Sequence, residues 1–142
     1  MRRVNVIGVG MTKFTSPKAL RPYTEMGKEA LLDAFKDAGI EYREIEHAYC
    51  GWVYADSCAG QKVLYEVGMT GIPIFNVNNN CSTGSSALFL ARQAVATGVV
   101  ECALALGFEQ MTPGALGIVF TDRPVPMQTF FEKLFEVIPS IE

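Results

Sequence analysis

A cysteine at position 81 stands where a thiol could act as a nucleophile. It follows three asparagines, residues 78–80, that end an apolar run, and it precedes the small residues Ser-Thr-Gly at 82–84. This order predicts a strand, a turn and the start of a helix. Backbone donors and the dipole at a helix N-terminus stabilise a thiolate, so a thiol placed there has a pKa below its usual value of about 8.5. Cys81 is therefore a candidate for covalent catalysis.

The position of Cys81 is consistent with two interpretations, one catalytic and one structural. The amides of the helix start, including the backbone N–H of Cys81, could hold an oxyanion during acyl transfer. The alternative is a small buried cysteine at a strand–helix junction, which is an ordinary place for a free thiol. Both interpretations stay open at this point. The other cysteines, Cys50, Cys58 and Cys102, form no C-x-x-C pair, so we expect no metal site and no redox dithiol.

Two further motifs are weak candidates for chemistry. Gly8 and Gly10 follow an apolar run as in a dinucleotide fingerprint, but Lys13 stands where the third glycine should be, which favours a simple strand-to-loop turn. His47 is the only histidine. It is expected at the start of a strand, at the sheet edge opposite Cys81, and a strand of five or six residues spans about 17–20 Å. We therefore expect His47 to be a hydrogen-bonded core or rim residue and not the base for Cys81.

The elements that must position Cys81 alternate between strands and helices. Apolar runs and helical periodicity predict strands at 4–9, 45–53, 72–77 and 99–107, and helices at 23–38, from 56 or 57 to 68, and at 82–96. The resulting β-α-β-α-β-α-β order implies right-handed crossovers and a mostly parallel sheet with helices on both faces, which is an α/β fold. The run at 99–107 is apolar enough for a central strand covered on both sides.

Composition limits the function classes. The chain has 142 residues, of which 49% are hydrophobic, and a net charge of −3 from scattered charged residues, so a nucleic-acid partner is not expected. No apolar run approaches the ~18 residues of a membrane span, and no signal-peptide pattern is present. We place a core domain at residues 1–109. The composition of the sequence changes at residues 110–142. This region carries several prolines and then an apolar stripe at helical spacing: Phe130, Phe131, Leu134, Phe135 and Ile138.

The sequence around Cys81, Asn-Asn-Asn-Cys-Ser-Thr-Gly-Ser-Ser-Ala-Leu, resembles the nucleophile motif of thiolases. The segments Gly-Met-Thr-Gly-Ile-Pro-Ile, Leu-Ala-Leu-Gly-Phe-Glu-Gln-Met and Val-Gly-Met-Thr-Lys-Phe resemble the sterol-carrier-protein branch of that family. The similarity runs from about Val4 to Arg123. It implies that Cys81 takes an acyl group from acyl-CoA as a thioester, that coenzyme A thioesters are substrates, and that no cofactor is permanently bound. Residues that bind coenzyme A remain unassigned.

The resemblance also implies what is missing. Thiolases have two duplicated halves in a five-layered fold, and this chain corresponds to an incomplete amino-terminal half, with residues 110–142 as the truncated start of a loop region. The Gly-His-Pro histidine and the second acid/base cysteine of the other half are absent. We therefore expect an acyltransferase for 3-ketoacyl-CoA thiolysis or condensation in lipid or sterol metabolism that is inactive as this chain alone. Its expected partners are a chain supplying the carboxy-terminal half, or a second copy paired through the strand at 72–77.

Two alternatives differ from a thiolase. One is a non-catalytic truncated isoform or subunit that binds lipid or partner proteins. The other is a relative of steroid side-chain retro-aldolases, against which the intact cysteine motif argues. The expected location is cytoplasmic, or peroxisomal in a eukaryote, although the terminal Pro-Ser-Ile-Glu matches no targeting signal.

Overall fold

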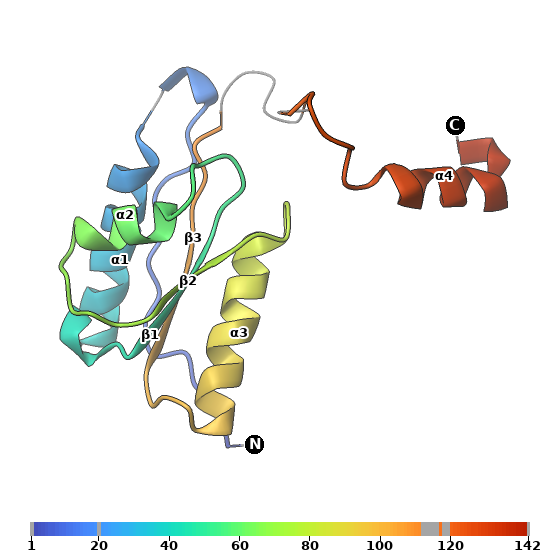
Figure 1. Ribbon diagram of the computed structural model, residues 1–142. Helices are drawn as coiled ribbons and strands as arrows, with labels where there is room; N and C mark the ends of the chain where they lie inside the picture. The colour runs from blue at the N-terminus through green and yellow to red at the C-terminus, as the bar shows by residue number, and fades with distance from the viewer. Residues whose placement is uncertain (1, 20, 112–116, 118–119, 142) are drawn as a thin grey trace. The chain divides into compact units, whose positions relative to one another are not determined.

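The structure is a computed structural model that describes residues 2–19, 21–111, 117 and 120–141. The chain divides into two units, residues 1–111 and 112–142. The first unit contains α1 (Tyr23–Ala38), β1 (His47–Gly51), α2 (Ala59–Tyr65), β2 (Ile74–Val77), α3 (Thr83–Thr97) and β3 (Ala103–Gly107), with 3-10 turns at Pro17–Ala19 and Tyr42–Glu44 (Figure 1). The second unit contains α4 (Gln128–Val137) and a 3-10 turn at Pro139–Ile141.

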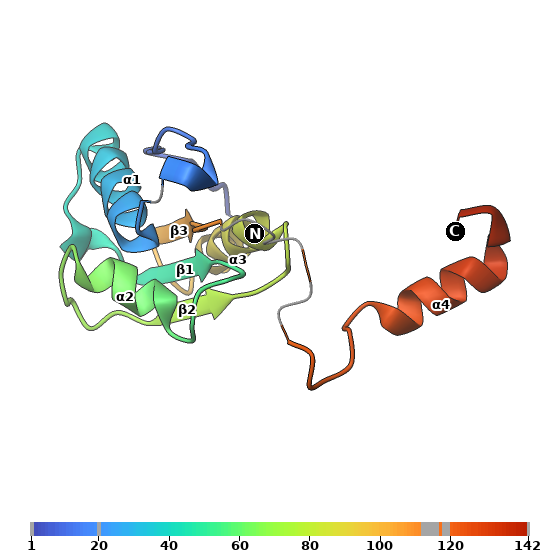
Figure 2. The ribbon, with the colours of Figure 1, turned by 90° about the horizontal axis from the view of Figure 1, so that it is seen from above.

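The three strands form one parallel sheet in the order β2-β1-β3. Ala48 of β1 pairs with Ile74 of β2 on one side and with Leu104 of β3 on the other. Helices α1 and α2 cover one face of the sheet and α3 covers the other, as the view from above shows (Figure 2). The predicted α/β class, the parallel strands and the helices on both faces are therefore confirmed.

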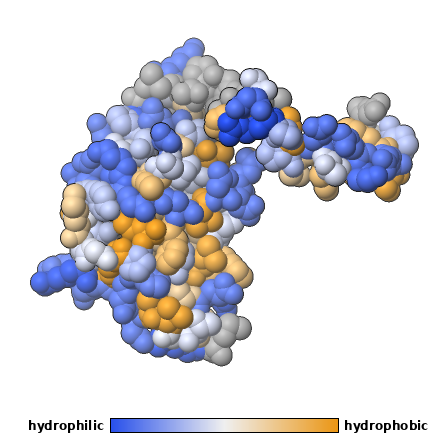
Figure 3. All heavy atoms as spheres, in the orientation of Figure 1, coloured by the Kyte–Doolittle hydropathy of each residue, from blue (hydrophilic) through white to orange (hydrophobic). Residues whose placement is uncertain are grey.

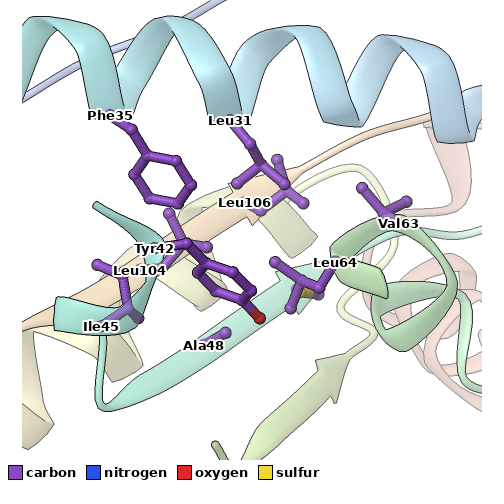
Figure 4. Close-up of a cluster of buried hydrophobic side chains, with 10 residues drawn as sticks. Leu31, Phe35, Tyr42, Ile45, Ala48, Val63, Leu64, Leu104 and Leu106 are labelled. Carbon is purple, nitrogen blue, oxygen red and sulfur yellow. The ribbon is translucent and has the colours of Figure 1, made fainter. Parts of the chain in front are cut away.

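The face beneath α1 holds the larger of two buried clusters. Leu31 and Phe35 lie one turn apart on α1 and point toward the sheet, where they meet side chains of β1, β3 and α2 (Figure 4). Helix α1 ends as its sequence predicts, because Gly39 adopts a left-handed conformation with φ 68°. The cluster consists of Leu31, Phe35, Tyr42, Ile45, Ala48, Cys50, Val63, Leu64, Leu104 and Leu106.

The face beneath α3 is packed with small residues. Ala87, Ala91 and Ala94 recur at three and four positions along α3 and are buried, together with Tyr49 of β1 and Val100. Alanine at each contact lets the helix axis lie close to the strands. The prediction that this helix is largely buried holds for that stripe, whereas Leu88 and Phe89 on another side of α3 are 55% and 57% exposed.

Two predictions about the sheet are wrong. Residues 4–9 do not form a strand, and β3 is an edge strand of the described sheet and not a central one. A strand needs a hydrogen-bonded neighbour, and among the described residues none pairs with the segment 4–9. The apolar side chains of that segment stay in part exposed, with Val6 at 72% and Ile7 at 57%. The helix predicted to start near residue 56 begins at Ala59, since the N–H of Ser57 is bound by the Asp56 carboxylate in a local turn.

Residues 2–10 are held against α1 instead. A Cβ atom added to Gly10 would lie 2.1 Å from the carbonyl oxygen of Ala30, and one added to Gly8 would lie 2.5 Å from that of Ala34. These glycines therefore serve close packing on α1, which accounts for them without a nucleotide. Arg2 anchors the start of the segment through Nε to the Val95 carbonyl at 2.6 Å and through Nη1 to the Glu101 carboxylate at 2.7 Å.

The second unit contains the helix that the apolar stripe predicts. Helix α4 carries Phe130, Phe131, Leu134 and Phe135, and none of its residues is buried. Within the part of the chain that the structure describes, no helix combines the length and apolarity of a transmembrane span.

Two neighbouring leucines of α1 allow a test of this packing. Leu31 is 1% exposed, whereas Leu32 is 48% exposed. We expect Leu31→Ala to lower the free energy of unfolding by about 2–5 kcal/mol, because it leaves a cavity between helix and sheet. Leu32→Ala should lower it by less than about 1 kcal/mol, as surface truncations usually do. Urea unfolding followed by circular dichroism measures both, and equal losses would contradict the described orientation of α1.

A carboxylate gives the fold a predictable acid sensitivity. Glu46, just before β1, accepts the backbone N–H groups of Cys102 at 3.0 Å and of Glu101, and these hydrogen bonds lower the pKa of its carboxyl group. A lowered folded-state pKa stabilises the fold above the unfolded-state pKa, and this stabilisation is lost as the pH falls through the folded-state value. We therefore expect Glu46→Gln to destabilise the chain at pH 7 and to have little effect at strongly acidic pH.

Urea titrations across the acid range measure this dependence. Asp33→Asn, which changes an exposed carboxylate of α1, is the matched control and should leave the pH profile close to that of the parent chain. A constant difference between Glu46→Gln and the parent at every pH would contradict the assigned role.

Candidate active site

Cys81 lies on the turn between the carboxyl end of β2 and the start of α3. It precedes Ser82, the N-cap residue of a helix that begins at Thr83, so the predicted strand, turn and helix are confirmed. The thiol is exposed, and its sulfur lies 3.8 Å from the Asn80 side-chain oxygen. The alternative of a buried junction cysteine does not describe this chain, because Cys81 is accessible from solvent.

The three asparagines form the turn that presents Cys81. Asn80 has a φ of 50°, a left-handed conformation that asparagine tolerates better than most residues. Its N–H is bound by the Asn78 side chain at 3.1 Å, and its carbonyl oxygen accepts the N–H of Thr83 at 3.0 Å. The Asn79 carbonyl accepts the N–H of Ser82 at 3.2 Å. The turn is therefore closed by its own polar groups.

Side chains at the start of α3 form hydrogen bonds with the residues of this turn. Asn79 donates from Nδ2 to the Ser86 hydroxyl at 2.9 Å, and that hydroxyl donates to the Ser82 carbonyl at 3.1 Å. The Thr83 hydroxyl donates to the Val77 carbonyl at the end of β2 and accepts the N–H of Asn79. Each of these polar residues therefore restrains the position of Cys81.

Glycines allow the start of α3 to lie directly on the sheet. A Cβ atom on Gly51, at the end of β1, would lie 2.6 Å from the Thr83 carbonyl oxygen, and one on Gly107, at the end of β3, would lie 3.4 Å from the Gly84 Cα. The helix N-terminus therefore sits over the carboxyl ends of two parallel strands. That edge of an open α/β sheet is where ligands commonly bind.

The remaining thiols differ from Cys81 in their surroundings. Burial raises the pKa of Cys50 to about 12, and burial followed by the nearby Glu46 raises the pKa of Cys102. Both stay protonated at neutral pH, and a protonated thiol is a poor nucleophile. Cys58, at the N-cap of α2, is exposed like Cys81 but adopts a left-handed conformation with φ 64°. Two of the four cysteines are therefore accessible.

The structure separates His47 from Cys81, as predicted. His47 begins β1, with its Nδ1 3.3 Å from the Tyr49 hydroxyl and its ring edge-on to Phe75. Cys81 lies beyond the opposite, carboxyl end of the strands, and β1 alone is about 13 Å long at its usual rise per residue. His47 is a hydrogen-bonded rim residue. Among the residues that the structure covers, no group of three or more His, Cys, Asp or Glu side chains could hold a metal ion.

Sequence reasoning missed Glu109. Its carboxylate accepts the N–H groups of Val53 at 2.8 Å, Tyr54 at 3.3 Å and Gln110 at 3.2 Å, and so fixes the loop after β1 to the segment after β3. The available signal was an acidic residue two positions beyond an apolar parallel strand, where a carboxylate can bind free amides at the sheet edge.

The comparisons with known proteins agree with this geometry. Residues 4–117 match the family model for the thiolase N-terminal domain. Sterol carrier protein 2 from Homo sapiens is 55% identical over 137 residues, which are 94% of this chain and 25% of that protein. An acetyl-CoA acetyltransferase from Methanothermobacter thermautotrophicus is 35% identical over 117 residues, which are 79% of this chain and 30% of that protein.

A solved structure shows the same fold. The Ltp2-ChsH2(DUF35) aldolase superposes with a TM-score of 0.60 at 22% identity over 94% of this chain and 33% of that one. The chain spans about a quarter of the length of the sterol carrier proteins that it matches. Because the family model covers most of its residues, the chain belongs to the thiolase family and carries the N-terminal domain of a sterol-carrier-protein-type thiolase.

Proposed function

We propose that Cys81 accepts an acyl group from an acyl-CoA within a thiolase whose remaining parts lie outside residues 1–142. The thiolate attacks the thioester carbonyl carbon, the bond from that carbon to the coenzyme A sulfur breaks, and coenzyme A leaves as a thiolate that takes up a proton. The observation that carries this proposal is an exposed thiol on a polar turn at the start of α3, at the carboxyl edge of the sheet.

The local structure supports part of this chemistry. Amides of the first helical turn, together with the N–H of Cys81, are suited to the oxyanion of the tetrahedral intermediate. A thiolase must also move protons, and His47 lies at the wrong edge of the sheet for that role. The base therefore comes from another part of the complete enzyme, and the chain alone is expected to be inactive in 3-ketoacyl-CoA thiolysis and condensation. Coenzyme A thioesters act as substrates, and no permanent cofactor is required.

The free edge of β2 supports a second copy as partner. Its four residues, Ile-Phe-Asn-Val, carry no charge that would discourage pairing with another strand. Phe75 is 43% exposed, and apolar residues gather on the face of the molecule where β2 lies (Figure 3). We propose a homodimer through this edge in the complete protein.

Thiol labelling tests the nucleophile assignment. With iodoacetamide near pH 7, we expect Cys81 to be modified faster than Cys102, because the Cys81 thiol is exposed whereas burial raises the pKa of Cys102. Cys50 should resist modification until the chain unfolds, since its thiol is buried with a pKa of about 12. Peptide mapping by mass spectrometry gives the rates, and equally slow modification of Cys81 and Cys102 would count against the nucleophile assignment.

Substitution tests the acyl transfer. The full chain, combined with the remaining sequence of the human relative and incubated with acetyl-CoA, should acquire one acetyl group on Cys81. Cys81→Ser should abolish that thioester, and Cys58→Ser, the control at the other exposed thiol, should retain it. Intact-mass measurement and hydroxylamine release identify the thioester. If Cys81→Ser leaves every activity of the reconstituted protein unchanged, the non-catalytic, lipid- or partner-binding alternative is the better description.

A further inference from the structure

The turn that presents Cys81 is tied to α3 by one pair of side chains, Asn79 and Ser86. Asn79 donates from Nδ2 to the Ser86 hydroxyl at 2.9 Å, and that hydroxyl donates to the Ser82 carbonyl at 3.1 Å. Asn79 lies two residues before the thiol and Ser86 five residues after it. The pair therefore joins the connection between β2 and α3 to the first turn of the helix (Figure 1).

The Asn79–Ser86 pair closes a ring of hydrogen bonds around Cys81. The Asn79 carbonyl accepts the Ser82 N–H at 3.2 Å and the Ser82 hydroxyl at 2.9 Å. The Ser82 carbonyl accepts the Ser86 N–H at 3.0 Å as well as the Ser86 hydroxyl. With the Asn79 side chain bound to Ser86, each of the three residues is linked to the other two. The backbone is thereby fixed both before and after residues 80–81.

The position of the thiol depends on this backbone. The Cys81 side chain is exposed, and its sulfur lies 3.8 Å from the Asn80 side-chain oxygen, a long contact that restrains it little. Asn80 has a φ of 50°, a conformation that a residue other than glycine keeps only where the surrounding structure imposes it. The ring of hydrogen bonds supplies that restraint, and so it determines where the sulfur lies.

The pair has more effect on geometry than on the stability of the fold. Asn79 is exposed and Ser86 is half-buried. A hydrogen bond between neutral groups that water can reach adds little to the free energy of folding, because water offers each group a substitute partner. Acyl transfer is far more sensitive to position, since a displacement of about 1 Å can lower a rate about a hundredfold.

We infer that Asn79 and Ser86 are positioning residues for acyl transfer at Cys81, acting through the backbone of the turn and not by contact with the substrate. The inference rests on the proposed function for the reaction that the pair serves. The Ser86 hydroxyl is the essential group, since it accepts from Asn79 and donates to Ser82. Threonine carries the same hydroxyl and can replace Ser86, whereas alanine cannot.

Acetylation kinetics test the role of the pair. The full chain is combined with the remaining sequence of the human relative and acetyl-CoA, and the acetyl group on Cys81 is followed by intact mass. Ser86→Ala should lower the rate at saturating acetyl-CoA by about tenfold or more, with the half-saturating concentration changed less than about twofold. Ser86→Thr should keep the parent rate within about twofold.

The neighbouring serine provides the matched control. Ser85 is exposed, and among the described residues its side chain forms no hydrogen bond. Ser85→Ala should therefore leave both the saturated rate and the half-saturating concentration unchanged. Urea midpoints of Ser85→Ala and Ser86→Ala should be similar, which separates a loss of positioning from a loss of stability.

A double variant tests whether the two residues act as one unit. Asn79→Ala should slow acetylation about as much as Ser86→Ala, because either change removes the same hydrogen bond. The variant with both changes should then be within about twofold of each single variant, whereas the effects of independent residues would multiply. Multiplied effects would contradict the proposed pairing.

Amide exchange tests the pair without any acyl transfer. In the isotopically labelled chain alone, Ser86→Ala should speed the exchange of the Ser82 and Thr83 amides, which close the turn, by about tenfold. Ser85→Ala should not. The Ala91 amide, in the middle of α3, is the internal control.

Two results would overturn the inference. The first is unchanged exchange of the Ser82 and Thr83 amides in Ser86→Ala. The second is a saturated rate of Ser86→Ala that equals that of the parent, or that falls only together with the urea midpoint and is not restored by Ser86→Thr. A parent protein that acquires no acetyl group would instead contradict the proposed function, and the role in acyl transfer with it, even where exchange shows that the pair fixes the turn.

Discussion

The close approach of α3 to the carboxyl ends of β1 and β3 is the contact on which the rest of the site depends. It requires glycine at position 51, since a side chain there would collide with the first turn of the helix. It also requires the alanine stripe at Ala87, Ala91 and Ala94, which keeps the helix close to the strands along its whole length. The consequence is that the turn before α3, and Cys81 with it, has little freedom to move.

The fold also places its cysteine thiols in environments that differ in burial and polarity. Cys50 belongs to the core beneath α1, where desolvation disfavours the thiolate, and Cys102 is shifted in the same direction by burial and a nearby carboxylate. Cys81 is placed on a polar turn of asparagine, serine and threonine side chains that bind one another and the local backbone. The same residue type thus serves as a packing element in the sheet and as an accessible thiol at its edge.

Much of this arrangement could be predicted from sequence because the signals were local. Helix α1 and its glycine cap, the order of elements, and the turn before α3 each follow from the periodicity or turn preference of adjacent residues. The role of Glu109 was missed because its hydrogen bonds reach residues more than fifty positions earlier in the chain. The separation of His47 from Cys81 was predictable because strand direction in a parallel sheet places the two at opposite edges.

The two wrong predictions have a single physical cause. Residues 4–9 and 99–107 both have the composition of buried strands. Strand pairing, however, depends on two segments of the chain and not on the composition of one. The composition of a strand reflects the environment in which it is stable. Strand β3 is apolar and carries no charge or proline, a composition suited to neighbours on both sides. The exposed Val6 and Ile7 indicate the same for the amino-terminal segment. The disagreement about the sheet is therefore confined to residues 4–9 and β3, the two segments whose pairing depends on a neighbour and not on their own composition.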